Sequence, residues 1–183
     1  MLETDRLLIK LLKPEISNLV LRYYLRNKDS FAATEALRPS NFYTLDYWEE
    51  HASKSLLEFK NDQAVRFCLF DKAHPDHMIG TANFTQIFRG PFQACYLGYA
   101  IDKKSEGKGL MTEALVKTIQ YMFDDLNLHR IMADYLPDNA RSARVLEKLG
   151  FVIEGKAQKY LFINGDWRDH VLTSLTNNSW RQS

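Results

Sequence analysis

The order of the elements expected between residues 92 and 163 most constrains what this chain can fold into. Within about fifty residues, a loop with two glycines opens one helix, a capped helix follows, and a Gly-Phe pair begins a strand. In chain order we expect a strand at 92–101, a helix at 107–123, a strand at 130–135, a helix at 138–149 and a strand at 151–163. This order predicts a mixed fold of helices and strands.

The rest of the chain extends the same pattern on both sides. We expect a strand at 6–12, helices at 15–28 and 45–60, strands at 65–70 and 78–88, and a last strand at 167–176. Asn164-Gly165 is a strong hairpin signal between the last two strands. Because no repeat or linker interrupts the chain, residues 1–183 are expected to form one domain.

The charge balance and the cysteines exclude several classes of protein. The chain has 24 Lys and Arg against 23 Asp and Glu, which argues against a basic domain that reads nucleic acid. No window approaches the ~18 apolar residues of a membrane span, and no signal peptide opens the chain, so we expect a cytoplasmic protein. Cys68 and Cys95 stand in apolar runs without metal-ligand spacing, which predicts buried thiols and no metal site.

A glycine-containing loop is the first motif with chemical meaning. Residues 104–111 read Lys-Ser-Glu-Gly-Lys-Gly-Leu-Met and directly precede a long amphipathic helix. A helix start carries unpaired N–H groups, and glycines let the backbone approach an anion such as a pyrophosphate. The loop lacks the spacing of a P-loop, and Thr112 stands where a dinucleotide fold has its third glycine. Taken alone, this motif is a weak signal and is better explained as a plain helix-capping turn.

The second motif, at 137–142, reads Pro-Asp-Asn-Ala-Arg-Ser and on its own is only a capped helix. In this order, the two motifs resemble the GNAT superfamily of acyl-CoA-dependent N-acyltransferases. The loop resembles that family's pyrophosphate loop, and Asn139 and Ser142 match the Asn-x-x-Ser of the ribosomal-protein alanine N-acetyltransferases of the RimJ and RimL type. Segments along nearly the whole chain, including 4–7, 92–99 and 165–170, are most similar to the RimJ type.

The resemblance implies a fold, a reaction and partners. The implied fold is α+β, with one mixed, mostly antiparallel twisted sheet flanked by about four helices. The implied reaction transfers an acetyl group from acetyl-CoA to the N-terminal α-amine, expected to be alanine, of a ribosomal protein. A ribosome-assembly intermediate is a further implied partner.

The resemblance also implies individual site residues. Ser142 matches the residue beside the leaving thiolate, as a hydrogen-bond or proton donor. Lys104 replaces the family's usual Arg or Gln. A bulged strand at 96–101 would supply backbone N–H groups to the thioester carbonyl. The implied cofactor-binding positions are Ile101, Lys104, Gly107, Lys108, Gly109, Leu110, Met111 and Asn139.

The proton donor and the general base remain open at this stage. A tyrosine matches the thiolate better in pKa than a serine, so Tyr96, Tyr99 and Tyr135 compete with Ser142. RimL-type relatives use a glutamate as the base where this chain has Leu161. Glu35, in the connection between the first two helices, is one candidate base, and a chain of waters is another.

The missing glutamate favours an α-amine acceptor. An α-ammonium group, with a pKa of about 7.7–8.0, is already roughly 10–15% neutral at pH 7, whereas a lysine side chain near 10.4 is almost fully charged. Two other functions stay open: acetylation of a small amine, and a non-catalytic acyl-CoA-binding module in ribosome assembly. The stretch 31–43 would decide between protein and small-molecule acceptors, because it flanks the acceptor groove in this family.

Overall fold

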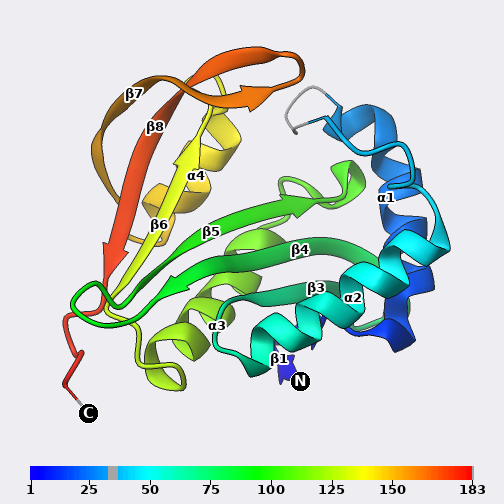
Figure 1. Cartoon of the computed structure of the whole chain (residues 1–183), viewed down its shortest axis with the longest axis horizontal. Coiled ribbons are helices and arrows are strands. Elements are labelled where there is room, and N and C mark those ends of the chain that lie inside the picture. The colour runs from blue at the N-terminus through cyan, green and yellow to red at the C-terminus, as the bar shows by residue number, and fades with distance from the viewer. Residues whose placement is uncertain (33–36, 183) are drawn as a thin grey trace.

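A computed structural model describes residues 1–32 and 37–182. One eight-stranded sheet crosses the molecule in the order β1-β2-β3-β4-β5-β6-β8-β7, and only the β5–β6 pair is parallel (Figure 1). The strands are β1 (Leu2–Glu3), β2 (Leu7–Leu11), β3 (Val65–Asp71), β4 (His74–Phe88), β5 (Ala94–Ile101), β6 (Arg130–Tyr135), β7 (Val152–Ile163) and β8 (Asp166–Thr176). The helices are α1 (Ser17–Phe31), α2 (Leu45–Lys60), α3 (Leu110–Asp124) and α4 (Ala140–Lys148), with short 3-10 turns η1 (Pro14–Ile16) and η2 (Lys103–Ser105). The predicted α+β fold class is confirmed.

Most element boundaries agree with the sequence, and the exceptions have local causes. The helix predicted from Gly107 begins only at Leu110, because Gly107 and Gly109 have left-handed φ values of 72° and 76°. The strand predicted from Phe92 begins at Ala94, since Gln93 has a φ of 43°. The first helix runs to Phe31, later than predicted. Strand β1, only two residues long, was not predicted.

The sheet separates two buried clusters. On one face, α3 and the core side of α4 pack through Met111, Leu115 and Leu146 against the central strands. On the other face, α1 and α2 bury an aromatic cluster that includes Tyr24, Phe42 and Trp48. Cys68 and Cys95 are free and buried as expected, and burial raises the pKa of each thiol to about 12.

The two halves of the sheet separate between β5 and β6. Their parallel pairing joins Ala94 to Arg130 and ends at Tyr96 and Met132, after which the strands diverge (Figure 1). The bulge expected within 96–101 is not there, because that segment pairs with β4 in unbroken register from Tyr96 to Ile101. The irregularity lies on β4 instead, between Thr85 and Phe88, where Gln86 has a φ of 52°. The divergence of the strands, rather than a bulge, therefore frees one edge of β5.

The described residues contain neither a membrane-spanning helix nor a cluster of metal ligands. No helix is long and apolar enough to cross a membrane. No group of three or more His, Cys, Asp or Glu side chains is arranged to hold a metal ion within residues 1–32 and 37–182.

Candidate active site

The glycine loop between β5 and α3 presents a backbone surface. Gly107 and Gly109 are exposed, and a Cβ atom at Gly107 would meet no atom within 4 Å. Gly109 is the N-cap of the fifteen-residue helix α3 and has no side chain to cap it. The first N–H groups of α3 and the positive end of its dipole therefore lie at an exposed loop beside the Arg6 guanidinium, which suits an anion. Lys104 is exposed at the edge of this loop.

The N-terminal residues hold this loop in place, a role that sequence reasoning missed. The Glu113 carboxylate, in the first turn of α3, accepts hydrogen bonds from the Thr4 hydroxyl (2.5 Å), the Arg6 backbone N–H (3.0 Å) and the Arg6 Nε (2.7 Å). Arg6 Nη1 also donates to the Lys108 carbonyl at 3.0 Å. Burial raises the pKa of Glu113, but the hydrogen bonds from Thr4 and Arg6 and the Arg6 charge lower it further, so the net shift is downward. The only sequence hint was a Thr-x-Arg run at the start of the chain.

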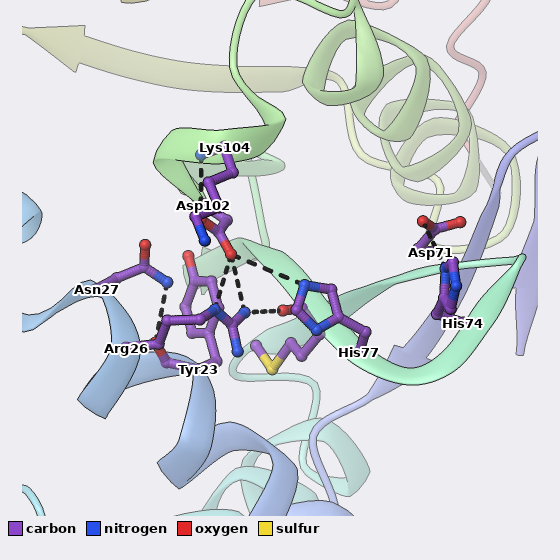
Figure 2. Close-up of polar contacts among 9 residues, drawn as sticks. Tyr23, Arg26, Asn27, Asp71, His74, His77, Asp102 and Lys104 are labelled. Carbon is purple, nitrogen blue, oxygen red and sulfur yellow. Dashed lines mark hydrogen bonds and ion pairs between the residues drawn. The ribbon is translucent and has the colours of Figure 1, made fainter.

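An ion pair between a buried carboxylate and a partly exposed arginine joins the other end of the loop to α1. Arg26 Nε donates to Asp102 Oδ2 at 2.9 Å, and Arg26 Nη2 donates to the Met78 carbonyl at 2.6 Å (Figure 2). Asp102 is 3% exposed, and its Oδ1 accepts from the Lys104 backbone N–H at 3.2 Å. His77 Nε2 lies 4.0 Å from the same carboxylate. Asp102, where the loop begins, is thus held by α1, which lies on the face of the sheet opposite α3.

The second motif forms the N-terminus of α4 beside the loop. The Asn139 side chain accepts from the Ser142 backbone N–H at 3.1 Å and so caps the helix. The Ser142 hydroxyl in turn lies 2.7 Å from the Tyr99 hydroxyl, which comes from β5. The structure therefore unites Ser142 with one of its three tyrosine competitors.

The environment of Tyr99 determines what its hydroxyl can do. Burial raises the pKa of Tyr99 to about 12, although the hydrogen bond with Ser142 opposes the shift. The phenol therefore stays protonated at neutral pH and can donate a hydrogen bond. Tyr135 packs nearby against the same core. Cys95 and Leu97, on either side of Tyr96, pack in the core beneath α3. Because side chains alternate along a strand, the Tyr96 side chain projects from the other face of the sheet.

A cavity of about 280 Å³ opens on the face of the sheet that carries α1 and α2. Its floor includes Gly98, Tyr99 and Ala100 of β5, directly behind the Tyr99–Ser142 contact. A Cβ atom at Gly98 would meet nothing within 4 Å, so the missing side chain leaves this floor open. The remaining walls combine aliphatic, aromatic and polar side chains and comprise Leu12, Val20, Tyr24, Arg38, Phe42, Tyr47, Trp48, His51, Arg66, Cys68, Thr81 and Asn83.

The structure does not test the one residue that the sequence offered as a general base. Glu35 lies outside the described residues. Leu161, which stands where RimL-type relatives have a glutamate, pairs with Arg168 in the β7–β8 hairpin and has no ionisable group. His51 lines the cavity, and burial, followed by the Arg66 charge, lowers its pKa, so its imidazole is neutral near pH 7.

Comparisons with known proteins agree with this arrangement. The chain matches the Acetyltransferase (GNAT) domain family over residues 6–152. It is 42% identical to the ribosomal protein uS5-alanine N-acetyltransferase of Escherichia coli strain K12, over 98% of this chain and 92% of the relative. The crystal structure of the ribosomal-protein-S5-alanine acetyltransferase from Vibrio fischeri superposes with a TM-score of 0.95 and 40% identity, over 99% of this chain and 98% of that one.

A more distant structure extends the likeness in fold. RimJ from Mycobacterium smegmatis, in complex with CoA-disulfide, has a TM-score of 0.87 at 23% identity, over 97% of this chain and 85% of that one. The match over most of the chain and the 42% identity confirm the resemblance predicted from the two motifs. This chain belongs to the GNAT acetyltransferase family.

Proposed function

We propose that this protein transfers the acetyl group of acetyl-CoA to the N-terminal α-amine of a ribosomal protein, with alanine as the first residue. The observation that carries the proposal is the junction at Gly98 and Tyr99. This short segment lines a cavity on one face of the sheet and contacts Ser142 on the other. Two relatives with about 40% identity over nearly the whole chain are ribosomal protein S5-alanine acetyltransferases.

The loop and α4 would bind the cofactor. Backbone N–H groups from Gly107 to Met111 suit the CoA pyrophosphate, because they open a helix at two glycines. Ile101, Lys104 and Lys108 border the same loop, and Leu110 begins the helix. Asn139 would act by holding the α4 terminus, since its side chain caps Ser142.

The reaction would run through the floor of the cavity. The acceptor amine enters from the α1–α2 side and attacks the thioester carbon beside β5, whose free edge offers N–H groups to the carbonyl oxygen. The carbon–sulfur bond then breaks towards Ser142 and Tyr99. The pKa of Tyr99 is about 12, and that of a free thiol is about 8.5. Transfer of the phenol proton to the thiolate would therefore cost about 5 kcal/mol. The pair therefore stabilises the thiolate by hydrogen bonding, and the thiol proton comes from the amine nitrogen.

The proposed partner is a ribosomal protein, and the enzyme would meet it within a ribosome-assembly intermediate. The acceptor cavity fits a small first residue better than a long one, because aromatic side chains from α1 and α2 form much of its wall. Residues 1–183 would act as one catalytic domain, since both sides of the site depend on the same sheet.

Competition between two peptides tests the proposal. One peptide has a free N-terminal Ala and blocked lysines, and the other has a blocked N-terminus and free lysines. We expect faster acetylation of the α-amine by kcat/KM, with the acetyl group located by mass spectrometry. Faster modification of the lysine peptide, or of a small amine such as a polyamine, would contradict the proposed acceptor.

A further inference from the structure

Two titratable side chains lie beside the separation of β5 and β6 and have no role in the steps above. Asp134 belongs to β6, and His170 belongs to the neighbouring strand β8. His170 Nε2 lies 3.7 Å from Asp134 Oδ1. The imidazole is 4% exposed, whereas about a fifth of the Asp134 side chain remains accessible.

The alternation of side chains along β6 directs Asp134 towards the acceptor side. Ile131 and Ala133 pack in the core against α3, so Asp134 projects from the other face of the sheet, where α1 and α2 lie. The last parallel pair is Tyr96 with Met132, and two residues further along each strand are Gly98 and Asp134. The carboxylate therefore faces the gap between the strands on the same side of the sheet as the cavity, outside the cavity's own lining.

The hydrogen bond of His170 determines which of its nitrogens is free. Nδ1 lies 3.1 Å from the Arg168 carbonyl oxygen, which can only accept, so Nδ1 carries a hydrogen. In a neutral imidazole, Nε2 is then unprotonated, and this is the atom that faces Asp134. Asp134 and His170 together can therefore take up one further proton between them.

The groups around the pair fit this reading. Burial raises the pKa of Asp134, and the nearby His170 charge opposes that shift. Tyr160 of β7 packs against His170 with ring centroids 5.8 Å apart. Burial, and then the proximity of Tyr96 and Asp134, raise the pKa of Tyr160, so this phenol stays neutral. An added proton on the pair thus meets the neutral phenol of Tyr160 from β7.

We propose that Asp134 is the catalytic residue that receives the proton of the acceptor ammonium group, and that His170 is the positioning residue that holds this proton. The inference rests on the proposed function, because it needs an amine acceptor in the cavity. An imidazole, with an ordinary pKa of about 6.5, lies much nearer to the α-ammonium value of about 7.7–8.0 than a carboxylate near 3.9 does. The pair would thus take the role of the glutamate that RimL-type relatives have at the position of Leu161.

The protons balance over one turnover. The ammonium group gives one proton through Asp134 to His170 Nε2, which leaves a neutral amine. The nitrogen attacks the thioester carbon, and the tetrahedral intermediate loses a second proton from nitrogen as the carbon–sulfur bond breaks. That second proton ends on the CoA sulfur, and His170 releases the first to solvent before the next turnover.

The test compares Asp134→Asn with Asp169→Asn at saturating acetyl-CoA. Asp169 is the matched control, because it adjoins His170 in β8, is partly exposed, and interacts with Lys156 and the Lys159 N–H rather than with the pair. We expect Asp134→Asn to lower kcat about 100-fold at pH 7 and much less at pH 9, where most of the α-amine is already neutral. The control should stay within about twofold, since it leaves the pair intact. A loss of less than about threefold at pH 7, or an equal loss at both pH values in a folded variant, would overturn the proposal.

A second measurement keeps the test independent of the acceptor. The ¹⁵N chemical shift of His170 Nε2 should change in Asp134→Asn, because this nitrogen loses the carboxylate that it faces. An unchanged ¹⁵N shift would refute the shared proton. If the unsubstituted protein acetylates only small amines, the proposed function fails, while the pH-dependent loss in Asp134→Asn still decides the role of Asp134 with that amine.

Discussion

The hydroxyl groups of Tyr99 and Ser142 lie 2.7 Å apart and join the central strand β5 to the N-terminus of α4. The two residues are 43 positions apart in the chain, and each reaches the contact from a different side of the gap between β5 and β6. The Tyr99 hydroxyl also lies 3.3 Å from the Ser142 backbone carbonyl oxygen, which can only accept. When Tyr99 donates to the Ser142 oxygens, the serine hydroxyl hydrogen is left for a third group. This geometry makes the pair a single donor unit rather than two independent candidates.

If the pair acts as a unit, its two single variants should be non-additive. We expect Ser142→Ala and Tyr99→Phe each to lower kcat by about 10–100-fold, with the acetyl-CoA KM changed less, because the hydrogen bond strengthens as the thiolate forms. The double variant should be little worse than either single one. Tyr135→Phe, on the neighbouring strand, is the control. Fully additive losses, or losses below about threefold with chemistry rate-limiting, would reduce Ser142 to a helix residue.

The glycine loop can be tested with two glycines of equal backbone strain. Gly109 and Gly165 have φ values of 76° and 84°, so Gly→Val at either position should cost about 1–2 kcal/mol of stability. Only Gly109→Val places a side chain where the pyrophosphate is proposed to bind. We expect calorimetry to show acetyl-CoA binding at least about tenfold weaker for Gly109→Val and unchanged for Gly165→Val. Equal affinities in two folded variants would remove the pyrophosphate from this loop.

The Glu113 clamp predicts a pH-dependent contribution to stability. Because folding lowers the pKa of Glu113, its stabilising effect is present above the unfolded value near 4.5 and disappears as the pH falls through the lower folded value. Glu113→Gln should therefore lower the free energy of unfolding by about 1–2 kcal/mol at pH 7 and much less at pH 3. Urea titrations at both pH values, with the exposed Glu147→Gln as control, measure this difference. A deficit that persists undiminished at pH 3 would contradict the ionic role.

Local patterns in the sequence predicted the fold well, whereas contacts between strands far apart in the chain could not be predicted from the sequence. Hydrophobic periodicity, the Asn164-Gly165 turn and the Asn139 cap are all encoded within a few residues, and the structure has an element at each of these places. The Asp134–His170 contact depends on the pairing of β6 with β8, which no local pattern reveals. Similarly, Tyr99 could not be preferred over Tyr96 until the register of β5 showed which of them faces α4.

The Arg26–Asp102 ion pair yields the last prediction, because it couples the stability of the fold to cofactor binding. Arg26→Met removes the cation but keeps an apolar stem, and it leaves the Asp102 carboxylate buried without its main partner. The loss should approach about 3 kcal/mol, reduced by the one-third exposure of the Arg26 side chain and by His77 at 4.0 Å.

Asp102 also fixes the start of the glycine loop through the Lys104 N–H, so the same variant should bind acetyl-CoA more weakly. Arg22→Met, an exposed change one turn earlier on α1, is the matched control and should alter neither property. Urea unfolding and calorimetric titration with acetyl-CoA give the two readouts. If Arg26→Met lost stability but kept full acetyl-CoA affinity, the ion pair would support the sheet alone, and the loop would hold its shape through the Glu113 clamp.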